Sequence, residues 1–292
     1  MTIGLALSGG AVRGTAHVGV LKALLEAQIP INIVSGTSAG SLVGGGYAAG
    51  RSLVELEEFA TSLDDSLLDF NSSGAAKALV GSIFGRKASF AGMFKGNQVQ
   101  KLAHRLTFGM NIREAPIMVA LCAVDLVSGS TVFFTNAEIP SIRGDYVVCN
   151  DIPMADAIAA SCTIPAVFVP RPFGEMNLVD GGVTEYAPVK VLRDMGADYV
   201  VAVDLGRDAG DTQQADDLLE VASRSFDIMS RRLAGTTLQY ANAVIAPYVA
   251  DIGLFDFSRV NELIERGYKA AKRMIPTIKM QLNRPYSQRK VT

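Results

Sequence analysis

The feature that most constrains this chain is the run Gly36–Gly40, which reads Gly-Thr-Ser-Ala-Gly, together with the residues on either side of it. Ile31–Ser35 before the run is typical of a short buried strand, and Ser41–Ala49 after it is typical of a helix of small residues. A sharp turn between them would give Ser38 strained backbone angles and expose its hydroxyl, while the two flanking glycines prevent collisions. Because the chain has 28 glycines, an ordinary tight turn is the alternative interpretation.

A second glycine-rich turn lies near residue 10. Ile3–Leu7 is typical of a strand, which runs into Ser8–Gly14 and then into a helix that we expect to begin at Thr15. Glycines at a helix N-terminus let backbone N–H groups converge on an anion, either a nucleotide phosphate or the oxyanion of an acyl-transfer intermediate. The spacing matches neither G-x-G-x-x-G nor a P-loop, which favours acyl transfer.

The choice of a base depends on what the sequence lacks. The two histidines are His17 and His104, and the Ser-Asp-His order of α/β-hydrolases requires a histidine later in the chain. We interpret His17 as a packed helix residue, so an acid must serve as base. Asp180 follows the apolar run Met176–Val179 and precedes two glycines, which predicts a carboxylate at a strand end with open access. Taken alone, such an Asp-Gly-Gly is most often a turn.

Four stretches of the chain together resemble the patatin-like phospholipases, in particular the small bacterial members. The stretches, in chain order, are Ser8–Gly14, Gly36–Gly40, Ala159–Pro170 and Asp180–Gly182. They are similar to the family's glycine-rich oxyanion loop, its G-x-S-x-G, its A-S-x-x-x-P-x-x-F-x-P segment and its D-G-[GA]. The resemblance runs over nearly the whole chain and implies a lipid acyl hydrolase that needs no cofactor.

By this resemblance Ser38 is the nucleophile and Asp180 is its sole partner, so that the two form a Ser-Asp dyad. The resemblance further implies an oxyanion hole made by the backbone N–H groups of three residues: Gly9, Gly10 and Ala11. Supporting positions in the motifs are Arg13, Gly14, Gly36, Gly40, Gly181 and Gly182. A carboxylate is a weak base for a hydroxyl, and burial would raise its pKa toward the working pH.

The sequence departs from the family pattern at several positions. Ser8 and Ala11 stand where many members have glycine, and the methyl of Ala11 is compatible with the hole if its φ is negative. Glu185-Tyr186 replaces a polar pair that often contains asparagine, which predicts a different rim beside the aspartate. Arg13 has two interpretations: it holds the loop through a carbonyl or carboxylate, or it meets an anionic head group.

Strand and helix patterns alternate to the end of the chain, which predicts a three-layer α/β/α sandwich with a largely parallel or mixed sheet. We expect a single domain over residues 1–292, because no linker or repeat is visible. Further predicted strands are Ile117–Val124, Thr131–Thr135, Tyr199–Leu205 and Ala243–Ala246. Further predicted helices are Asn97–Leu106, Pro188–Met195, Asp216–Leu233 and Arg259–Gln281.

The composition favours an intracellular enzyme. The three cysteines, Cys122, Cys149 and Cys162, have no C-x-x-C spacing and resemble buried small hydrophobes in a reducing compartment. No metal-ligand cluster or cofactor motif is visible, and no run is long and apolar enough for a signal peptide or membrane span. We therefore expect a cytoplasmic protein, with an oligomeric state that the sequence leaves open.

The charges are unevenly distributed along the chain, although the formal net charge is −2. No acidic residue lies between Asp69 and Glu114, and basic residues there alternate with phenylalanines; a second acid-free tract follows Glu265. Basic residues among aromatics suit contact with an anionic membrane, and solvated helix faces are the alternative. The segment 71–113 is also a candidate lid, or an ordinary packed insertion. Nucleic acid is not expected, because the pI is about 5.8 and no binding motif is visible.

Three functional hypotheses follow from the sequence. The first is a serine hydrolase of acyl-ester lipids, of the phospholipase, lysophospholipase or carboxylesterase type. The second is an acyltransferase that passes the same acyl-enzyme to an alcohol, and the third is a non-catalytic lipid sensor or adaptor. The third hypothesis accounts for the fewest motifs, because a binding module does not need the serine, the acid and the anion-binding loop together.

Overall fold

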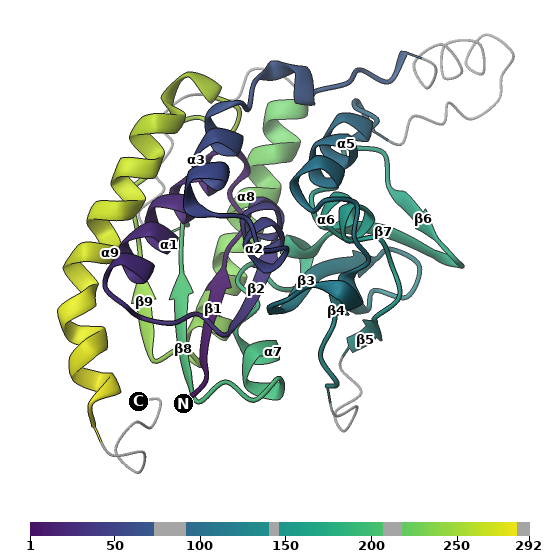
Figure 1. Ribbon diagram of the computed structural model, residues 1–292. Coiled ribbons are helices and arrows are strands. Elements are labelled where there is room, and N and C mark those ends of the chain that lie inside the picture. Colours follow the sequence, from purple (N-terminus) through teal and green to yellow (C-terminus); the bar gives the residue numbers. More distant parts are fainter. Residues whose placement is uncertain (73–91, 140–145, 207–217, 285–292) are drawn as a thin grey trace, which may run out of the picture.

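A mixed sheet runs through the centre of the protein (Figure 1) in the computed structural model, which describes residues 1–72, 92–139, 146–206 and 218–284. Its order is β5-β4-β3-β2-β1-β8-β9, with β7 paired to β3 and β6 paired to β7. The strands are β1 (Ile3–Leu7), β2 (Ile33–Thr37), β3 (Met118–Asp125), β4 (Thr131–Thr135), β5 (Tyr146–Cys149), β6 (Arg171–Phe173), β7 (Met176–Asp180), β8 (Tyr199–Val203) and β9 (Ala243–Ile245). The pairs β3–β4, β3–β7 and β6–β7 are antiparallel, and the remaining pairs are parallel.

Helices cover both faces of this sheet. They are α1 (Ala16–Glu26), α2 (Ala39–Ala48), α3 (Leu53–Thr61), α5 (Asn97–Leu106), α6 (Met154–Ser161), α7 (Val189–Asp194), α8 (Leu218–Leu238) and α9 (Val260–Leu282). On β1, Leu5 and Leu7 join the core formed with α1, α2, α6 and α9, whereas Ala6 joins the core formed with α7 and α8. This alternation follows the two-residue period of a strand buried on both faces. The predicted α/β/α class is confirmed.

Element boundaries near the candidate nucleophile differ from the predicted ones. The strand predicted over Ile31–Ser35 is β2, which runs from Ile33 to Thr37 because its parallel pairing with β1 begins at Ile33. Helix α2 begins at Ala39, two residues before the predicted start. Ser38 therefore links the strand directly to the helix.

The helix expected at Thr15 also begins differently. Residues Ala11–Thr15 form a 3₁₀ turn, and α1 begins at Ala16. The tighter turn allows the Gly10 carbonyl to accept from the Arg13 N–H at 3.0 Å.

Strands β2 and β7 approach each other end to end along the same strand, β3. Strand β2 is parallel to β3 and places Thr37 beside Cys122, whereas β7 is antiparallel and places Asp180 beside Ala123. Because Cys122 and Ala123 are consecutive, the C-terminal ends of β2 and β7 face each other. The topology thus brings residue 38 next to residue 180 although 142 positions of sequence separate them.

Part of the predicted lid is a packed helix. Helix α5 buries Val99, Leu102 and Ala103 and packs against α6. Residues 73–91, which include Arg86, Lys87 and Phe90 of the predicted membrane contact, lie outside the described residues. The described end of that segment reaches the body through a bridge between Phe94 and Phe168.

In the C-terminal basic tract, the first two cations are paired with acids. Arg266 on α9 forms ion pairs with Asp251 at 2.5 Å and with Glu262 at 2.5 Å, and Lys269 pairs with Glu265 at 3.1 Å. These contacts favour the interpretation of a solvated helix face for this part of the tract. Within the described ranges, no helix has the length and apolar character needed to cross a membrane.

Candidate active site

Ser38 adopts a backbone conformation that residues other than glycine rarely adopt, with φ of 54° and ψ of −124°. The glycines on both sides are required by close backbone approach. A β-carbon at Gly36 would lie 2.4 Å from the Gly40 carbonyl oxygen, and one at Gly40 would lie 2.3 Å from the Leu7 carbonyl oxygen. The sequence therefore folds here into a strained turn that presents the serine at the edge of the sheet.

The C-terminal end of α6 and the two residues after it hold both members of the predicted dyad. The Oγ of Ser161 accepts a hydrogen bond from the Ser38 N–H at 2.9 Å, and the Thr163 carbonyl accepts from the Asp180 N–H at 2.8 Å. The Sγ of Cys162 donates to the Ser38 carbonyl at 3.3 Å. Sequence reasoning identified this segment only by resemblance, because its contacts with Ser38 join residues more than a hundred positions apart.

Asp180 is fully buried at the end of β7. Its Oδ1 accepts a hydrogen bond from the Gly182 N–H at 2.8 Å, whereas Oδ2 has no hydrogen-bond partner among the described residues. Burial raises the pKa of Asp180 to about 7, and the nearby Ser38 hydroxyl and the Gly182 N–H oppose this rise. Gly181 is needed for the turn, because a β-carbon there would lie 2.5 Å from the Cys122 carbonyl oxygen.

The N–H groups predicted to form the oxyanion hole differ in their partners. The Gly9 N–H donates to the Tyr186 carbonyl at 3.0 Å, so it already has an acceptor. The N–H groups of Gly10 and Ala11 make no hydrogen bond within the part of the chain that the structure describes. The condition of a negative φ at Ala11 is not met, because its φ is 48°. This residue is therefore strained, as in many loops that bind a ligand.

Arg13 holds this loop from inside the protein. Its side chain is 3% exposed, its Nε donates to the Ile252 carbonyl at 2.6 Å, and its guanidinium lies 3.8 Å from the Asp227 carboxylate. A buried guanidinium with these partners supports the interpretation as a loop anchor rather than a contact for a head group. The adjacent Gly14 permits contact with α2, because a β-carbon there would lie 2.2 Å from the Ala39 β-carbon.

His17 is a structural residue of the same loop. Its ring is fully buried, and its Nε2 lies 2.8 Å from the Ser8 carbonyl oxygen. Burial lowers the pKa of His17 to about 4, so the ring is neutral and donates to that carbonyl at neutral pH. These contacts fit the predicted role of a packed helix residue.

Glu185 and Tyr186, which lie shortly after the Asp-Gly-Gly motif, hold neighbouring turns through their backbone carbonyls. The Glu185 carbonyl accepts from the Thr37 hydroxyl at 2.7 Å, and the Tyr186 carbonyl accepts from Gly9. Burial raises the pKa of the Glu185 carboxyl to about 7. The pair predicted to line the rim beside Asp180 therefore also stabilises the turns that carry Thr37 and Gly9.

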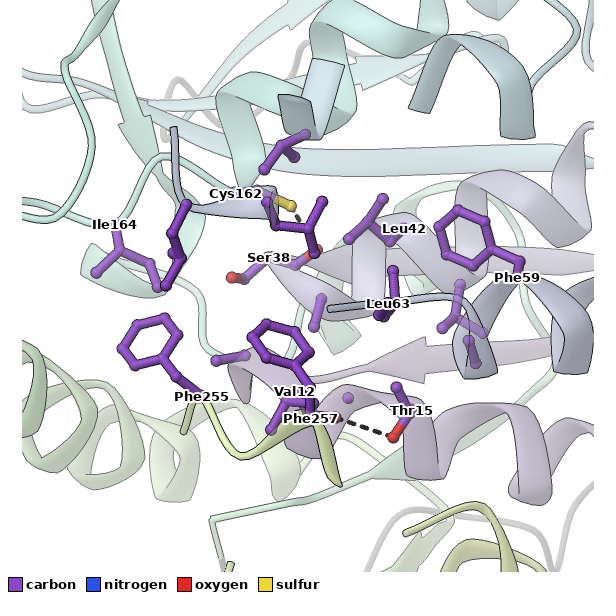
Figure 2. Close-up of a pocket in the computed structure, with 18 of the residues that line it drawn as sticks. Val12, Thr15, Ser38, Leu42, Phe59, Leu63, Cys162, Ile164, Phe255 and Phe257 are labelled. Carbon is purple, nitrogen blue, oxygen red and sulfur yellow. Dashed lines mark hydrogen bonds between the residues drawn. The ribbon is translucent and has the colours of Figure 1, made fainter. Parts of the chain in front are cut away.

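An apolar pocket opens beside Ser38, with a volume of about 90 Å³. Figure 2 shows Leu42, Phe59 and Leu63 on one side of it and Phe255 and Phe257 on another. These side chains come from α2, α3, the segment after α3 and the segment before α9. Their chemistry suits a hydrocarbon chain.

A smaller and more polar pocket lies on the Asp180 side of the serine, with a volume of about 30 Å³. Both dyad residues and the loop at Gly10 line it, and α8 contributes Asp227 and Ser230. Sequence reasoning missed these α8 residues, because no local motif marks them. Ser38 therefore lies where an apolar and a polar pocket meet.

Comparison with known proteins supports the assignment of the motifs. The sequence profile described as patatin-like phospholipase matches residues 5–193, which is more than half of the chain. The chain belongs to the patatin-like phospholipase family. The fold agrees with that of VipD from Legionella pneumophila, at a TM-score of 0.54 and 13% sequence identity, with coverage of 94% of this chain and 66% of that one.

Two curated relatives match nearly the whole of this patatin-like chain. An uncharacterized NTE family protein of Mycobacterium tuberculosis is 29% identical over 265 residues, which cover 90% of this chain and 60% of that protein. Lysophospholipase NTE1 of Mycosarcoma maydis is 30% identical over 309 residues, which cover 94% of this chain and 15% of that protein. The chain thus spans only part of the length of these relatives.

Proposed function

We propose that this protein is a serine hydrolase of acyl-ester lipids that uses Ser38 and Asp180 as a catalytic dyad. The observation that carries the proposal is the meeting of β2 and β7 beside β3, which sets a strained serine against a buried aspartate at the mouth of an apolar pocket. The family membership and the name of the Mycosarcoma relative, a lysophospholipase, support the same class of substrate.

The reaction follows from the pKa and position of Asp180. Its carboxylate takes the proton of the Ser38 hydroxyl while Oγ attacks the ester carbonyl carbon. The protonated Asp180 then gives that proton to the alcohol oxygen as the carbon–oxygen bond breaks, which leaves an acyl-enzyme. Water then attacks the acyl carbon and gives a proton to Asp180, which passes it to the Ser38 Oγ as the bond to the acyl group breaks and the fatty acid is released. A pKa of about 7 suits both directions of proton transfer near neutral pH.

We assign stabilisation of the oxyanion to the N–H groups of Gly10 and Ala11, with the Gly9 N–H holding the loop through Tyr186. Donors of this kind act on the charge that develops in the transition state, and loss of one typically costs about 2.7–4 kcal/mol. The acyl chain is assigned to the apolar pocket lined by Leu42, Phe59 and Phe257. With the acyl chain in the apolar pocket, the alcohol part of the ester lies in the polar pocket beside Asp180.

The dyad is tested by two substitutions, Ser38→Ala and Asp180→Asn, assayed on p-nitrophenyl octanoate and on a lysophospholipid. We expect each variant to keep the wild-type circular dichroism spectrum and to lose at least about 1,000-fold in kcat, because neither residue has a substitute. Ser62→Ala, which changes an exposed serine, is the matched control. Near-normal turnover by Asp180→Asn would exclude the dyad, and a complete loss in a folded His17→Ala variant would restore histidine as base.

Two further measurements separate the alternatives. A fluorophosphonate probe should label Ser38 in the folded protein, and absence of labelling would favour a non-catalytic lipid sensor. Product analysis with and without an added alcohol distinguishes hydrolysis from acyl transfer, because both reactions use the same acyl-enzyme.

A further inference from the structure

The polar pocket contains a buried hydroxyl that has no hydrogen-bond partner among the described residues. Ser230 on α8 is 2% exposed, and its Oγ has no hydrogen-bond partner within the described ranges. Leaving a buried hydroxyl unpaired costs about 1–3 kcal/mol, so such a group in a pocket is suited to bind a ligand.

The position of this hydroxyl relates it to the chemistry of the dyad. A β-carbon built at Gly182 would lie 3.2 Å from the Ser230 Oγ and 3.1 Å from the Asp180 Oδ1, so both oxygens border the same small space. Asp180 must hand its proton to the departing alcohol oxygen, which therefore lies on this side of Ser38. The alcohol part of the ester thus enters the space that Ser230 borders.

The charges around the pocket indicate which alcohol it accepts. The Asp227 carboxylate already pairs with Arg231 at 3.1 Å and lies 3.8 Å from the Arg13 guanidinium. Because these cations compensate Asp227, the pocket does not require a cationic ligand. Its volume of about 30 Å³ holds about two water-sized groups, since one such group needs at least about 10–15 Å³.

We propose that Ser230 is a specificity-determining residue that binds a hydroxyl group on the alcohol part of the substrate, next to the ester. This inference rests on the proposed hydrolase function and assigns to α8 a residue that recognises the alcohol part of the ester. By microscopic reversibility, the same subsite receives the water or alcohol that attacks the acyl-enzyme. In transfer, that alcohol gives its proton to Asp180, bonds to the acyl carbon, and displaces Ser38, which regains the proton.

The test compares two octanoate esters that differ only in the hydroxyls of a three-carbon alcohol: 1-octanoylglycerol and propyl octanoate. We expect the wild type to prefer the glycerol ester in kcat/KM, and Ser230→Ala to reduce this preference roughly three- to tenfold. The control is Thr237→Val, which removes a buried hydroxyl of the same helix that bonds the Ala234 carbonyl. This control should keep the wild-type ratio of the two esters.

The possible results separate the inference from the proposed function. Hydrolysis of p-nitrophenyl octanoate that depends on Ser38 establishes the hydrolase, and its absence overturns both proposals. With the hydrolase established, an unchanged ratio in Ser230→Ala, or an equal shift in Thr237→Val, overturns the role of Ser230.

A measurement on the wild type alone covers the case in which Ser230→Ala does not fold. Acyl transfer from p-nitrophenyl octanoate to glycerol should exceed transfer to 1-propanol at equal concentration. Equal transfer to the two acceptors, or no preference between the two octanoate esters, would show that no hydroxyl is bound there.

Discussion

At the scale of single residues, the proposed nucleophile Ser38 has a strained backbone, which a side chain distant in sequence stabilises. The Ser38 N–H points to the Ser161 Oγ at 2.9 Å, so this amide is not available to an oxyanion. A strained conformation persists only where its surroundings fix it, and here α6 supplies the acceptor. Ser161 is therefore a positioning residue for the serine.

Ser161→Ala should reduce kcat roughly tenfold or more on p-nitrophenyl octanoate. The change leaves the buried Ser38 N–H without an acceptor, which costs about 1–3 kcal/mol and lets the turn relax. The control is Thr163→Val, because the Thr163 hydroxyl donates to the Ala159 carbonyl of α6 and, among the described residues, to no other group. Full activity in Ser161→Ala would show that the turn holds its shape without this contact.

The pKa of Asp180 predicts how pH affects activity and stability. The base must be ionised, so kcat/KM should rise with pH through about 7. Below about pH 4 the carboxyl is protonated in both states, and between about 4 and 7 it is ionised only in the unfolded chain. The free energy of unfolding therefore falls as pH rises through this window. Asp180→Asn lacks this effect.

Melting temperatures of wild type and Asp180→Asn, measured from pH 4 to 8.5, test this prediction. The advantage of the variant should grow up to about pH 7 and then level off. Burial also raises the pKa of Glu185 to about 7, but this group is present in both proteins and its effect largely cancels. A difference that does not change with pH would mean that Asp180 titrates near its ordinary value.

The local motifs were sufficient to identify Ser38 and Asp180 as a pair to be tested, because strand ends and glycine turns leave short-range patterns. The positive φ of Ala11 could not be foreseen, since it is set by the loop and not by the residue's own preference. Ser161 and Ser230 could not be found from the pattern of residues alone. Their partners and neighbours are distant in sequence, and only the fold brings them together.

At the scale of elements, α1 and α9 cross with their backbones in close contact. A β-carbon at Gly19 would lie 1.9 Å from the Ile264 carbonyl oxygen, and one at Gly267 would lie 1.9 Å from the Ala16 carbonyl oxygen. Figure 1 shows α9 lying along α1 at one side of the molecule. The contact also fixes the segment before α9, which carries Phe255 and Phe257 of the apolar pocket.

Gly267→Ala should lower the melting temperature by several degrees, because the added methyl forces the two helices apart. Overpacking of this kind costs about 1–3 kcal/mol, and each kcal/mol shifts the midpoint by roughly 2–4 °C in a large domain. Gly235→Ala on α8 is the matched control, since no atom lies within 4 Å of the added β-carbon. It should be neutral or slightly stabilising. Equal effects of the two substitutions in thermal unfolding would contradict the close crossing.

The regular elements were largely predictable because their periodicity is strong. Thr131–Thr135 and Asn97–Leu106 match β4 and α5 in both bounds. The missed elements include β5 and α6, which are four and eight residues long. Such short elements depend on their neighbours in the sheet and core, so their own sequences carry little signal.

At the scale of the whole molecule, the fold places an apolar pocket and a polar pocket on the two sides of Ser38. Helices α2 and α3 and the segment before α9 form the apolar pocket, whereas α8 closes the polar pocket beside Asp180. The dyad lies between them because β2 ends where β7 ends. In the proposed reaction, the topology thus sets the direction in which the substrate lies.

This arrangement predicts that narrowing the apolar pocket changes the preferred acyl chain. Leu63 is partly buried and lines that pocket, so Leu63→Trp should fill space needed by a long chain and leave room for a short one. We expect kcat/KM for p-nitrophenyl decanoate to fall roughly tenfold relative to p-nitrophenyl acetate, as an overpacking cost of 1–3 kcal/mol implies. Leu126→Trp, at a side chain that is 52% exposed, is the control. A parallel loss on both esters would indicate general damage, and an unchanged ratio would mean that the acyl chain lies elsewhere.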